Sequence, residues 1–306
     1  MKFDLAGKVV LITGGSRGLG LVMARQLVDD DARVAICARD PDELRRAKAD
    51  LLDQVLTITC DVTDPEQLDR LVGEVTEQLG PIDILINNAG IIQVGPMKLM
   101  TLEDYEAAMA THFWAPLRLT LAVLPRMFER GTGRIVNITS IGGKVAVPHV
   151  LPYTASKFAL VGLSEGMRAE LAKDNIKVTT VVPGLVRTGS PVHAQFKGRH
   201  HAEYKWFAAG DSSHLTAMEA ERAARQIISA MRHGRPEITL SVQAKLAARL
   251  VALAPGLAQR ALALVDRFLP KPGGIGEASA LGSESRRGPS LLTRASDRAA
   301  LRNNEL

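Results

Sequence analysis

Two side chains able to move a proton stand four positions apart, Tyr153 and Lys157, and Ser140 precedes the tyrosine by 13 residues. Residues four apart share one face of a helix. Tyrosine is a poor acid–base group at neutral pH, because its ordinary pKa is near 10, but an adjacent ammonium favours the phenolate. Ser140 could then hold a substrate carbonyl while Tyr153 donates the proton. Taken alone, this spacing is equally typical of an ordinary pair of side chains on a helix surface. The surrounding sequence must therefore distinguish a catalytic pair from a surface pair.

A glycine-rich segment near the start of the chain is typical of a dinucleotide site. Thr13-Gly-Gly-Ser-Arg-Gly-Leu-Gly20 follows an apolar run and precedes an amphipathic stretch, with Gly14, Gly18 and Gly20 in a G-x-x-x-G-x-G pattern. Glycines let the backbone approach a pyrophosphate, and the helix start offers free N–H donors. A glycine-rich turn without a ligand is the alternative. The position in the first strand-to-helix turn favours the cofactor.

Arginines near that turn predict which dinucleotide binds. Arg39 directly follows Ala38, at the end of the second predicted strand, and Arg17 lies within the glycine-rich turn. Two guanidinium groups near one phosphate suit NADP(H). Asp40 stands one residue further on, and an acidic residue at the strand end would bind ribose hydroxyls and favour NAD(H). NADP(H) is therefore predicted, with NAD(H) and a pair of plain surface arginines as alternatives.

Short β-branched runs alternate with longer amphipathic stretches over residues 1–240. The predicted strands cover residues 8–13, 33–38, 54–59, 82–86, 134–139, 177–182 and 237–240. The predicted helices cover residues 19–28, 41–52, 65–79, 101–124, 152–172 and 216–232, and 188–210 is predicted irregular. This alternation predicts an α/β fold, a doubly wound parallel sheet of about seven strands with helices on both faces.

The remaining polar motifs fall where such a sheet binds ligands. Asn87-Asn-Ala-Gly90 and Ser140 follow strands, and Pro183-Gly184 follows another, with Thr188 shortly after it. Ligands of open α/β sheets bind at the carboxyl ends of the strands. The motifs are therefore expected to meet at one edge.

Together these motifs resemble the short-chain dehydrogenase/reductase family, in its branch with a single Rossmann-like domain. The resemblance covers residues 5–240 and rests on Thr13–Gly20, Asp61-Val62, Asn87–Gly90, Ser140, Tyr153, Lys157 and Pro183-Gly184, in the family's order.

The resemblance implies roles for individual positions. Tyr153 would be the catalytic acid/base, Lys157 would bind the nicotinamide ribose and lower the tyrosine pKa, and Ser140 would orient the carbonyl. The implied cofactor-binding residues are Gly14, Ser16, Arg17, Gly18, Leu19, Gly20, Arg39, Asp61, Val62, Asn88, Ala89, Gly90, Tyr153, Lys157, Pro183, Gly184 and Thr188. Among them, Asp61 and Val62 would contact adenine, and Thr188 would lie near the carboxamide. The family also pairs its long helices, here 101–124 and 152–172, into homodimers and homotetramers.

One position departs from the family pattern. The helix after the fourth strand usually carries an asparagine that helps water reach the lysine, and this sequence has His112 there. An imidazole can relay a proton, so His112 is a catalytic candidate. A packing histidine is the equal alternative.

Composition excludes several other classes of protein. Two cysteines, Cys37 and Cys60, cannot form a disulfide framework, and no metal site is expected, because His193, His200, His201 and His214 lack matching acidic partners. The net charge is +5, but residues 1–189 hold 21 basic and 23 acidic residues, so the excess belongs to the last third and does not indicate nucleic acid. No apolar run reaches the roughly 18 residues of a membrane span. The start lacks a signal-peptide apolar block, and the cytoplasm is expected.

The last third is predicted to hold parts beyond the catalytic domain of residues 1–240. Residues 241–270 read as two short cationic amphipathic helices, broken at Pro255-Gly256, and 271–306 as a flexible tail with a weak helix at 291–301. The two helices could lie on an anionic membrane, cover the substrate, or pack on the core or a second subunit. Trp206 and Phe207 could cap the substrate pocket or simply pack.

The sequence thus predicts an NADP(H)-dependent oxidoreductase that interconverts a ketone or aldehyde and an alcohol. The substrate is a small carbonyl compound, with a weak preference for a lipophilic one. Two alternatives stay open: an epimerase or dehydratase of nucleotide sugars, and a non-catalytic NADP-sensing regulator.

Overall fold

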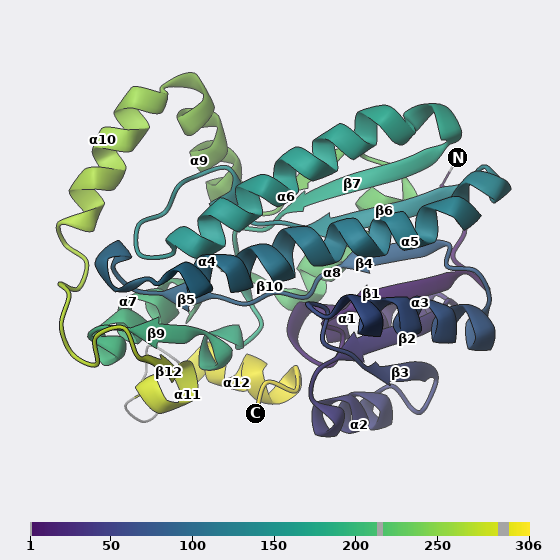
Figure 1. Cartoon of the computed structure of the whole chain (residues 1–306), viewed down its shortest axis with the longest axis horizontal. Helices are drawn as coiled ribbons and strands as arrows, with labels where there is room; N and C mark the ends of the chain where they lie inside the picture. The colour runs from purple at the N-terminus through teal and green to yellow at the C-terminus, as the bar shows by residue number, and fades with distance from the viewer. Residues whose placement is uncertain (1, 213–216, 287–293) are drawn as a thin grey trace.

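Seven parallel strands form one twisted sheet at the centre of the computed structural model, which describes residues 2–212, 217–286 and 294–306 (Figure 1). Their spatial order is β11-β7-β6-β4-β1-β2-β3, so the chain reverses direction across the sheet between β1 and β4. The strands are β1 (Val9–Thr13), β2 (Arg33–Ala38), β3 (Val55–Thr59), β4 (Ile84–Asn87), β6 (Gly133–Ile138), β7 (Ile176–Val182) and β11 (Glu237–Thr239). The predicted α/β, Rossmann-like doubly wound sheet is confirmed.

Helices cover both faces of the sheet because its strands are apolar on both sides. Val10 and Ile12 of β1 pack toward α1, α2 and α8, whereas Val9 and Leu11 pack toward α3 and α5. The helices of the sheet are α1 (Gly18–Asp29), α2 (Pro41–Asp50), α3 (Pro65–Leu79), α4 (Leu102–Met109), α5 (Ala115–Arg130), α6 (Leu151–Glu170) and α8 (Ala220–Arg232). A sheet buried on both faces reads as continuous apolar runs, which made the strands predictable.

A π-helical turn interrupts the helix predicted over 101–124. Residues Ala110–Trp114 form this turn between α4 and α5. A π turn inserts one extra residue into the helical spiral, and such turns often occur at functional sites. It carries His112.

The segment predicted to be irregular, 188–210, contains regular elements. After β8 (Leu185–Arg187), a short 3-10 helix (Ser190–His193) leads to β9 (Gln195–Lys197) and α7 (His200–Ser212). β9 forms a small second sheet with β5 (Gln93–Val94) and β12 (Ser279–Leu281), while β10 (Ala217–Glu219) pairs with β8. The mixed polar and aromatic sequence of this segment hides its periodicity, because its apolar side chains form a separate small cluster around Phe196.

The predicted flexible tail over 271–306 is wrong for the described part of that segment. β12 pairs antiparallel with β9, and α11 (Gly282–Ser285) and α12 (Arg294–Arg302) pack beside α7. Gly282 permits this, since an added Cβ would lie only 1.9 Å from the Pro191 carbonyl oxygen. Composition suggested a linker, but small residues here allow close packing. Residues 287–293 lie outside the described residues.

The two predicted amphipathic helices, α9 (Val242–Leu253) and α10 (Pro255–Asp266), form a hairpin at one end of the molecule (Figure 1). Only Ala244 of α9 is buried, and α10 has no buried residue. The hairpin therefore does not pack into the core. No described helix is both long and apolar enough to cross a membrane.

Candidate active site

Ser140 and Tyr153 meet at the carboxyl end of β6. Ser140 follows that strand and caps a short 3-10 helix, where its hydroxyl accepts a hydrogen bond from Gly142 N–H at 3.0 Å. Tyr153 is the third residue of α6, and its ring and the Ser140 hydroxyl both lie beside Gly142. Burial raises the pKa of the Tyr153 phenol, and the neighbouring Ser140 side chain acts against that rise. The two predicted hydroxyl residues thus lie next to each other.

Lys157 lies one turn further along α6 and is buried, at 4 % exposure. Its Nζ donates to the Ile138 carbonyl oxygen at 2.8 Å and lies 5.6 Å from the centre of the Tyr153 ring. Burial lowers the pKa of Lys157 to about 7. The amine is therefore able to gain or lose a proton near neutral pH, beside the tyrosine.

A chain of buried polar side chains fixes α6 on the sheet. Asn87 Nδ2 donates to Asn137 Oδ1 at 2.8 Å, and Asn137 Nδ2 donates to Ser164 Oγ at 3.0 Å. Ser164 Oγ lies 2.7 Å from Thr180 Oγ1. This chain joins β4, β6, α6 and β7, so it sets the position of the helix that carries Tyr153 and Lys157. The motifs found in the sequence do not include this chain, although Asn137 is a polar residue inside an apolar strand.

The His112 ring meets the Tyr153 ring edge-on, with 5.3 Å between the ring centres, and is fully buried. Its Nε2 accepts from Ile91 N–H at 3.1 Å, so its Nδ1 carries the proton and faces Ser156 Oγ at 2.7 Å. Ser156 in turn donates to the Tyr153 carbonyl oxygen. Burial, and secondarily the nearby Lys157, hold the pKa of His112 well below its ordinary value. Both ring nitrogens of a neutral imidazole thus have protein partners.

The backbone of the glycine-rich turn is closely packed at its glycines. Gly14 and Gly18 have positive φ, and a Cβ on Gly20 would lie 2.1 Å from the Gly14 carbonyl oxygen. Asn88 Nδ2 donates to the Thr13 and Gly14 carbonyl oxygens, while Thr13 Oγ1 accepts from the N–H groups of Asn88 and Ala89. These bonds tie the loop after β4 to the turn after β1. Leu19 is the second residue of α1, which begins at Gly18.

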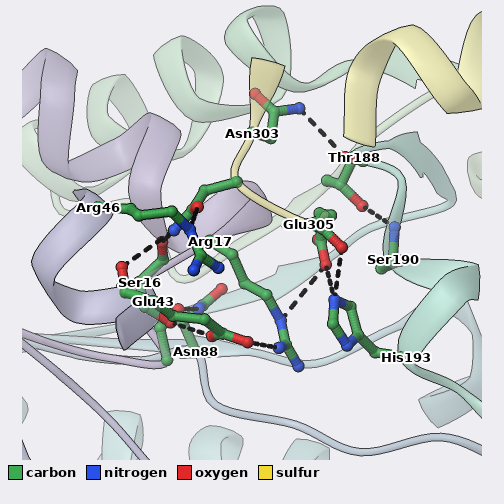
Figure 2. Close-up of polar contacts among 12 residues, drawn as sticks. Ser16, Arg17, Glu43, Arg46, Asn88, Thr188, Ser190, His193, Asn303 and Glu305 are labelled. Carbon is green, nitrogen blue, oxygen red and sulfur yellow. Dashed lines mark hydrogen bonds and ion pairs between the residues drawn. The ribbon is translucent and has the colours of Figure 1, made fainter. Parts of the chain in front are cut away.

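The two arginines predicted to meet one phosphate lie in different surroundings. Arg39 is exposed directly after β2, whereas Arg17 pairs with Glu43 and has Nε 3.3 Å from a Glu305 carboxylate oxygen (Figure 2). Ser16 also donates to Glu43. Asp40 accepts from the Asp42 and Glu43 N–H groups and so caps α2. The bond from the Glu43 N–H, and to a smaller extent that from the Asp42 N–H, lower the pKa of Asp40.

The remaining predicted cofactor residues line the same edge of the sheet. Asp61 accepts from Thr63, and Val62 is buried, both after β3. The Pro183 carbonyl oxygen accepts from Ile141 N–H, which joins the loop after β7 to the Ser140 loop, and Gly184 packs against Ser241. Thr188 Oγ1 accepts from Ser190 N–H. Gly90 lies against His112 Nε2, where an added Cβ would be 3.1 Å away.

The histidines of the irregular segment have separate partners. His193 bonds to the Glu305 carbonyl oxygen and His201 to that of Ser285, and His214 lies outside the described residues. Within residues 2–212, 217–286 and 294–306, no three His, Cys, Asp or Glu side chains form a group that could hold a metal. Trp206 and Phe207 pack with Tyr153 around Val150 and Phe196, and so form an apolar wall next to the tyrosine.

Comparisons with known proteins agree with this geometry. The family model for "short chain dehydrogenase" matches residues 8–195. The chain belongs to the short-chain dehydrogenase/reductase family.

The relatives within this family differ in the part of the chain they match. The dehydrogenase/reductase SDR family protein 7-like of Anopheles gambiae is 40 % identical over 198 residues, which are 62 % of this chain and 62 % of its own length. Ketoacyl reductase HetN of a Nostoc species is 40 % identical over 61 % of this chain and 67 % of its own. The structure of L-sorbose reductase from Gluconobacter frateurii, complexed with NADPH and L-sorbose, has a TM-score of 0.70 and 26 % identity, covering 79 % of this chain and 97 % of that one. The chain is therefore a short-chain oxidoreductase by family.

Proposed function

We propose that the protein is an NADP(H)-dependent reductase or dehydrogenase that interconverts a ketone or aldehyde and an alcohol. The carrying observation is that Ser140 and Tyr153 lie side by side with the buried Lys157 next to the tyrosine ring. A non-catalytic NADP-sensing regulator would not require this arrangement. An epimerase or dehydratase of nucleotide sugars would have a larger substrate domain, whereas the described chain beyond residue 240 forms a helical hairpin and short elements.

In the proposed mechanism the side chains handle the proton and the orientation of the substrate. The bound nicotinamide would supply or accept the hydride. Ser140 Oγ would donate to the substrate carbonyl oxygen, and Tyr153 would give its phenolic proton to that oxygen in reduction and take it back in oxidation. Lys157 in its protonated form stabilises the phenolate, because the two groups lie close together in a buried site.

His112 would position these groups rather than relay protons. Its ring holds the Ile91 backbone on one side and Ser156 on the other, and neither nitrogen is open to a water chain. We therefore infer the packing role for the residue that replaces the family's asparagine.

The cofactor would lie across the glycine-rich turn and the ends of the neighbouring strands. The pyrophosphate would bind at the α1 N-terminus, beside Gly18, where a helix start attracts negative charge. The exposed Arg39 would bind the 2′-phosphate, whereas Asp40 uses one carboxylate oxygen to cap α2. The NADPH in the sorbose reductase complex supports the same choice.

The substrate would be a carbonyl compound with an apolar part. Tyr153 borders the wall of Val150, Phe196, Trp206 and Phe207, which favours an apolar group next to the reacting carbon. The names of ketoacyl reductase relatives support a carbonyl substrate.

Replacing Tyr153 tests the proposed function. Tyr153→Phe should lower kcat by about 10²–10⁴-fold, because it removes the proton donor, and leave the dissociation constant of NADPH unchanged. Tyr105→Phe, on α4, is the matched control and should keep its rate. The measurement is NADPH oxidation over a panel of ketones and aldehydes. A Tyr153→Phe enzyme with near-normal turnover would contradict the proposal.

Exposed apolar residues on α5 and α6 support a homo-oligomer. Leu121, Phe128 and Phe158 are 42–58 % exposed on these long helices. A second copy packed there would bury them, and the molar mass from light scattering should exceed that of one chain. A monomer at micromolar concentration would contradict this.

The α9–α10 hairpin supports peripheral contact between a cytoplasmic enzyme and an anionic membrane. Leu250, Leu253 and Leu257 are 64–84 % exposed, as is Phe268 at 82 % just after α10. Residues 241–270 carry four basic side chains and one acidic one, and Lys245 also lines a groove with Arg222, Arg225 and Arg235. Cations beside an exposed apolar face suit anionic lipid. Leu253→Asp should weaken co-sedimentation with phosphatidylglycerol vesicles; equal binding of both proteins would contradict the contact.

A further inference from the structure

The last described residues of the chain lie across the start of α1 (Figure 2). The Gly18 N–H donates to the Asn303 carbonyl oxygen at 2.9 Å. Asn304 Nδ2 donates to the carbonyl oxygens of Ser16 and Glu43, and its Oδ1 accepts from Arg46 Nε at 2.7 Å. Backbone and side chains of the glycine-rich turn are thus bonded to residues almost 300 positions away.

Glu305 places an anionic group at this turn. It is 4 % exposed, and its carboxylate lies 3.3 Å from Arg17 Nε and 3.2 Å from His193 Nε2. It fills the space beside Gly18, where an added Cβ would be 2.6 Å from Glu305 Oε1. A carboxylate is favoured there for the reason a phosphate is, since a helix N-terminus attracts negative charge.

A packed helix holds this segment in place. Ala300 of α12 lies against Gly189, where an added Cβ would be 2.4 Å from the Ala300 Cα. Asn303 Nδ2 donates to the Thr188 carbonyl oxygen at 3.2 Å. The segment therefore spans both the pyrophosphate end of the predicted cofactor site and Thr188, the residue expected near the carboxamide.

We propose that residues 299–305 and the dinucleotide occupy the same site and exclude each other. The Gly18 N–H can serve only one acceptor at this position, and the space that glycine leaves for a pyrophosphate holds the Glu305 carboxylate. Two anionic groups at one helix start would also repel each other. The segment is thus an autoinhibitory contact, and cofactor binding requires its release. This inference rests on the proposed function, because it takes the glycine-rich turn as the dinucleotide site.

The apparent affinity for NADPH then depends on how often the segment is released. A site that is open in only a fraction of molecules binds with its intrinsic dissociation constant divided by that fraction. A change that loosens the segment without touching the turn should tighten cofactor binding.

Ala300→Leu in the full chain makes that change. The added bulk cannot fit against Gly189, and no charge near the turn is altered. Leu301→Ala is the matched control, because Leu301 is 72 % exposed on the same helix. The dissociation constant of NADPH, from its fluorescence, should fall at least tenfold in Ala300→Leu and stay within twofold of wild type in Leu301→Ala.

Hydrogen exchange of the wild-type protein gives a second measurement that needs no variant. Amides of 299–305 should be protected without cofactor and exchange faster with NADPH bound. An unchanged dissociation constant in Ala300→Leu, or slower exchange of 299–305 with NADPH, would overturn the exclusion while leaving the proposed function intact. Failure of every variant to bind NADPH or NADH would refute the proposed function itself.

Discussion

Replacing Lys157 with methionine should raise the free energy of unfolding above that of the wild type at neutral pH. This advantage over the wild type should disappear at alkaline pH. Burial lowers the pKa of Lys157 from 10.5 to about 7. One pKa unit corresponds to about 1.4 kcal/mol, so holding this lysine protonated in the folded state costs about 5 kcal/mol below pH 7. Methionine keeps much of the side-chain length and removes that cost.

The sign of the pH dependence follows from proton binding. Between pH 7 and 10.5 the unfolded chain holds a proton on Lys157 and the folded protein largely does not, so the stability of the wild type rises with pH. The cost of the buried lysine should fall by about 3 kcal/mol between pH 6.5 and 9.5. Methionine also leaves the Ile138 carbonyl oxygen without its partner, at a cost of about 1–3 kcal/mol.

Urea denaturation at both pH values measures this directly. Lys157→Met should be more stable than wild type by about 2–4 kcal/mol at pH 6.5, and this advantage should vanish near pH 9.5. Lys98→Met replaces an exposed lysine and is the control; its effect should stay within about 0.5 kcal/mol at both pH values. A difference between wild type and Lys157→Met that does not change with pH would refute the reasoning.

Two other substitutions test the site. His112→Gln should lower the free energy of unfolding by about 2–3 kcal/mol at pH 7, since it disrupts buried hydrogen bonds. This deficit should shrink as the pH falls below 6.5, because folding lowers the pKa of His112 in the wild type and the variant has no histidine at this position. A constant deficit in urea titrations from pH 7 to 5 would contradict a neutral histidine. Arg39→Asp should raise the dissociation constant of NADPH by about 10–100-fold, because only NADPH has a 2′-phosphate to bond, and should lower that of NADH, because an acidic residue at the strand end binds ribose hydroxyls. Arg126→Asp, on α5, is its control. Equal effects of Arg39→Asp on both cofactors would show that Arg39 does not read the phosphate.

Local sequence patterns were sufficient to predict the parallel sheet and to place most candidate site residues at the ends of its strands. Most strands are largely apolar runs, and the glycine-rich turn, Asn87–Gly90, Ser140 and Pro183-Gly184 lie at the strand ends or just after them. Parallel strands bring their carboxyl ends to one edge, so these motifs had to meet there. The predicted single helix over 101–124 missed the π turn, because one extra residue leaves the apolar pattern almost unchanged.

The tertiary structure decided what each side chain bonds to. His112, for which the sequence allows either a proton relay or a packing role, has both ring nitrogens bonded, to Ile91 and Ser156. Asp40, which could favour NAD(H), caps α2 through one of its carboxylate oxygens. The low pKa of Lys157 depends on burial, which no spacing in the sequence expresses.

The C-terminal segment shows most clearly which features the sequence determines and which only the tertiary structure determines. The sequence by itself determined a Rossmann-like sheet with Ser140, Tyr153 and Lys157 in the family's order, because these features arise from short-range periodicity and from strand ends. The glycine- and serine-rich composition after residue 270 predicted a solvated tail. The structure instead places Asn303, Asn304 and Glu305 on the glycine-rich turn. Only the tertiary structure shows this contact, because the bonding partners are almost 300 residues apart in the sequence. A local sequence pattern does not predict which distant residues a polar segment will bond to.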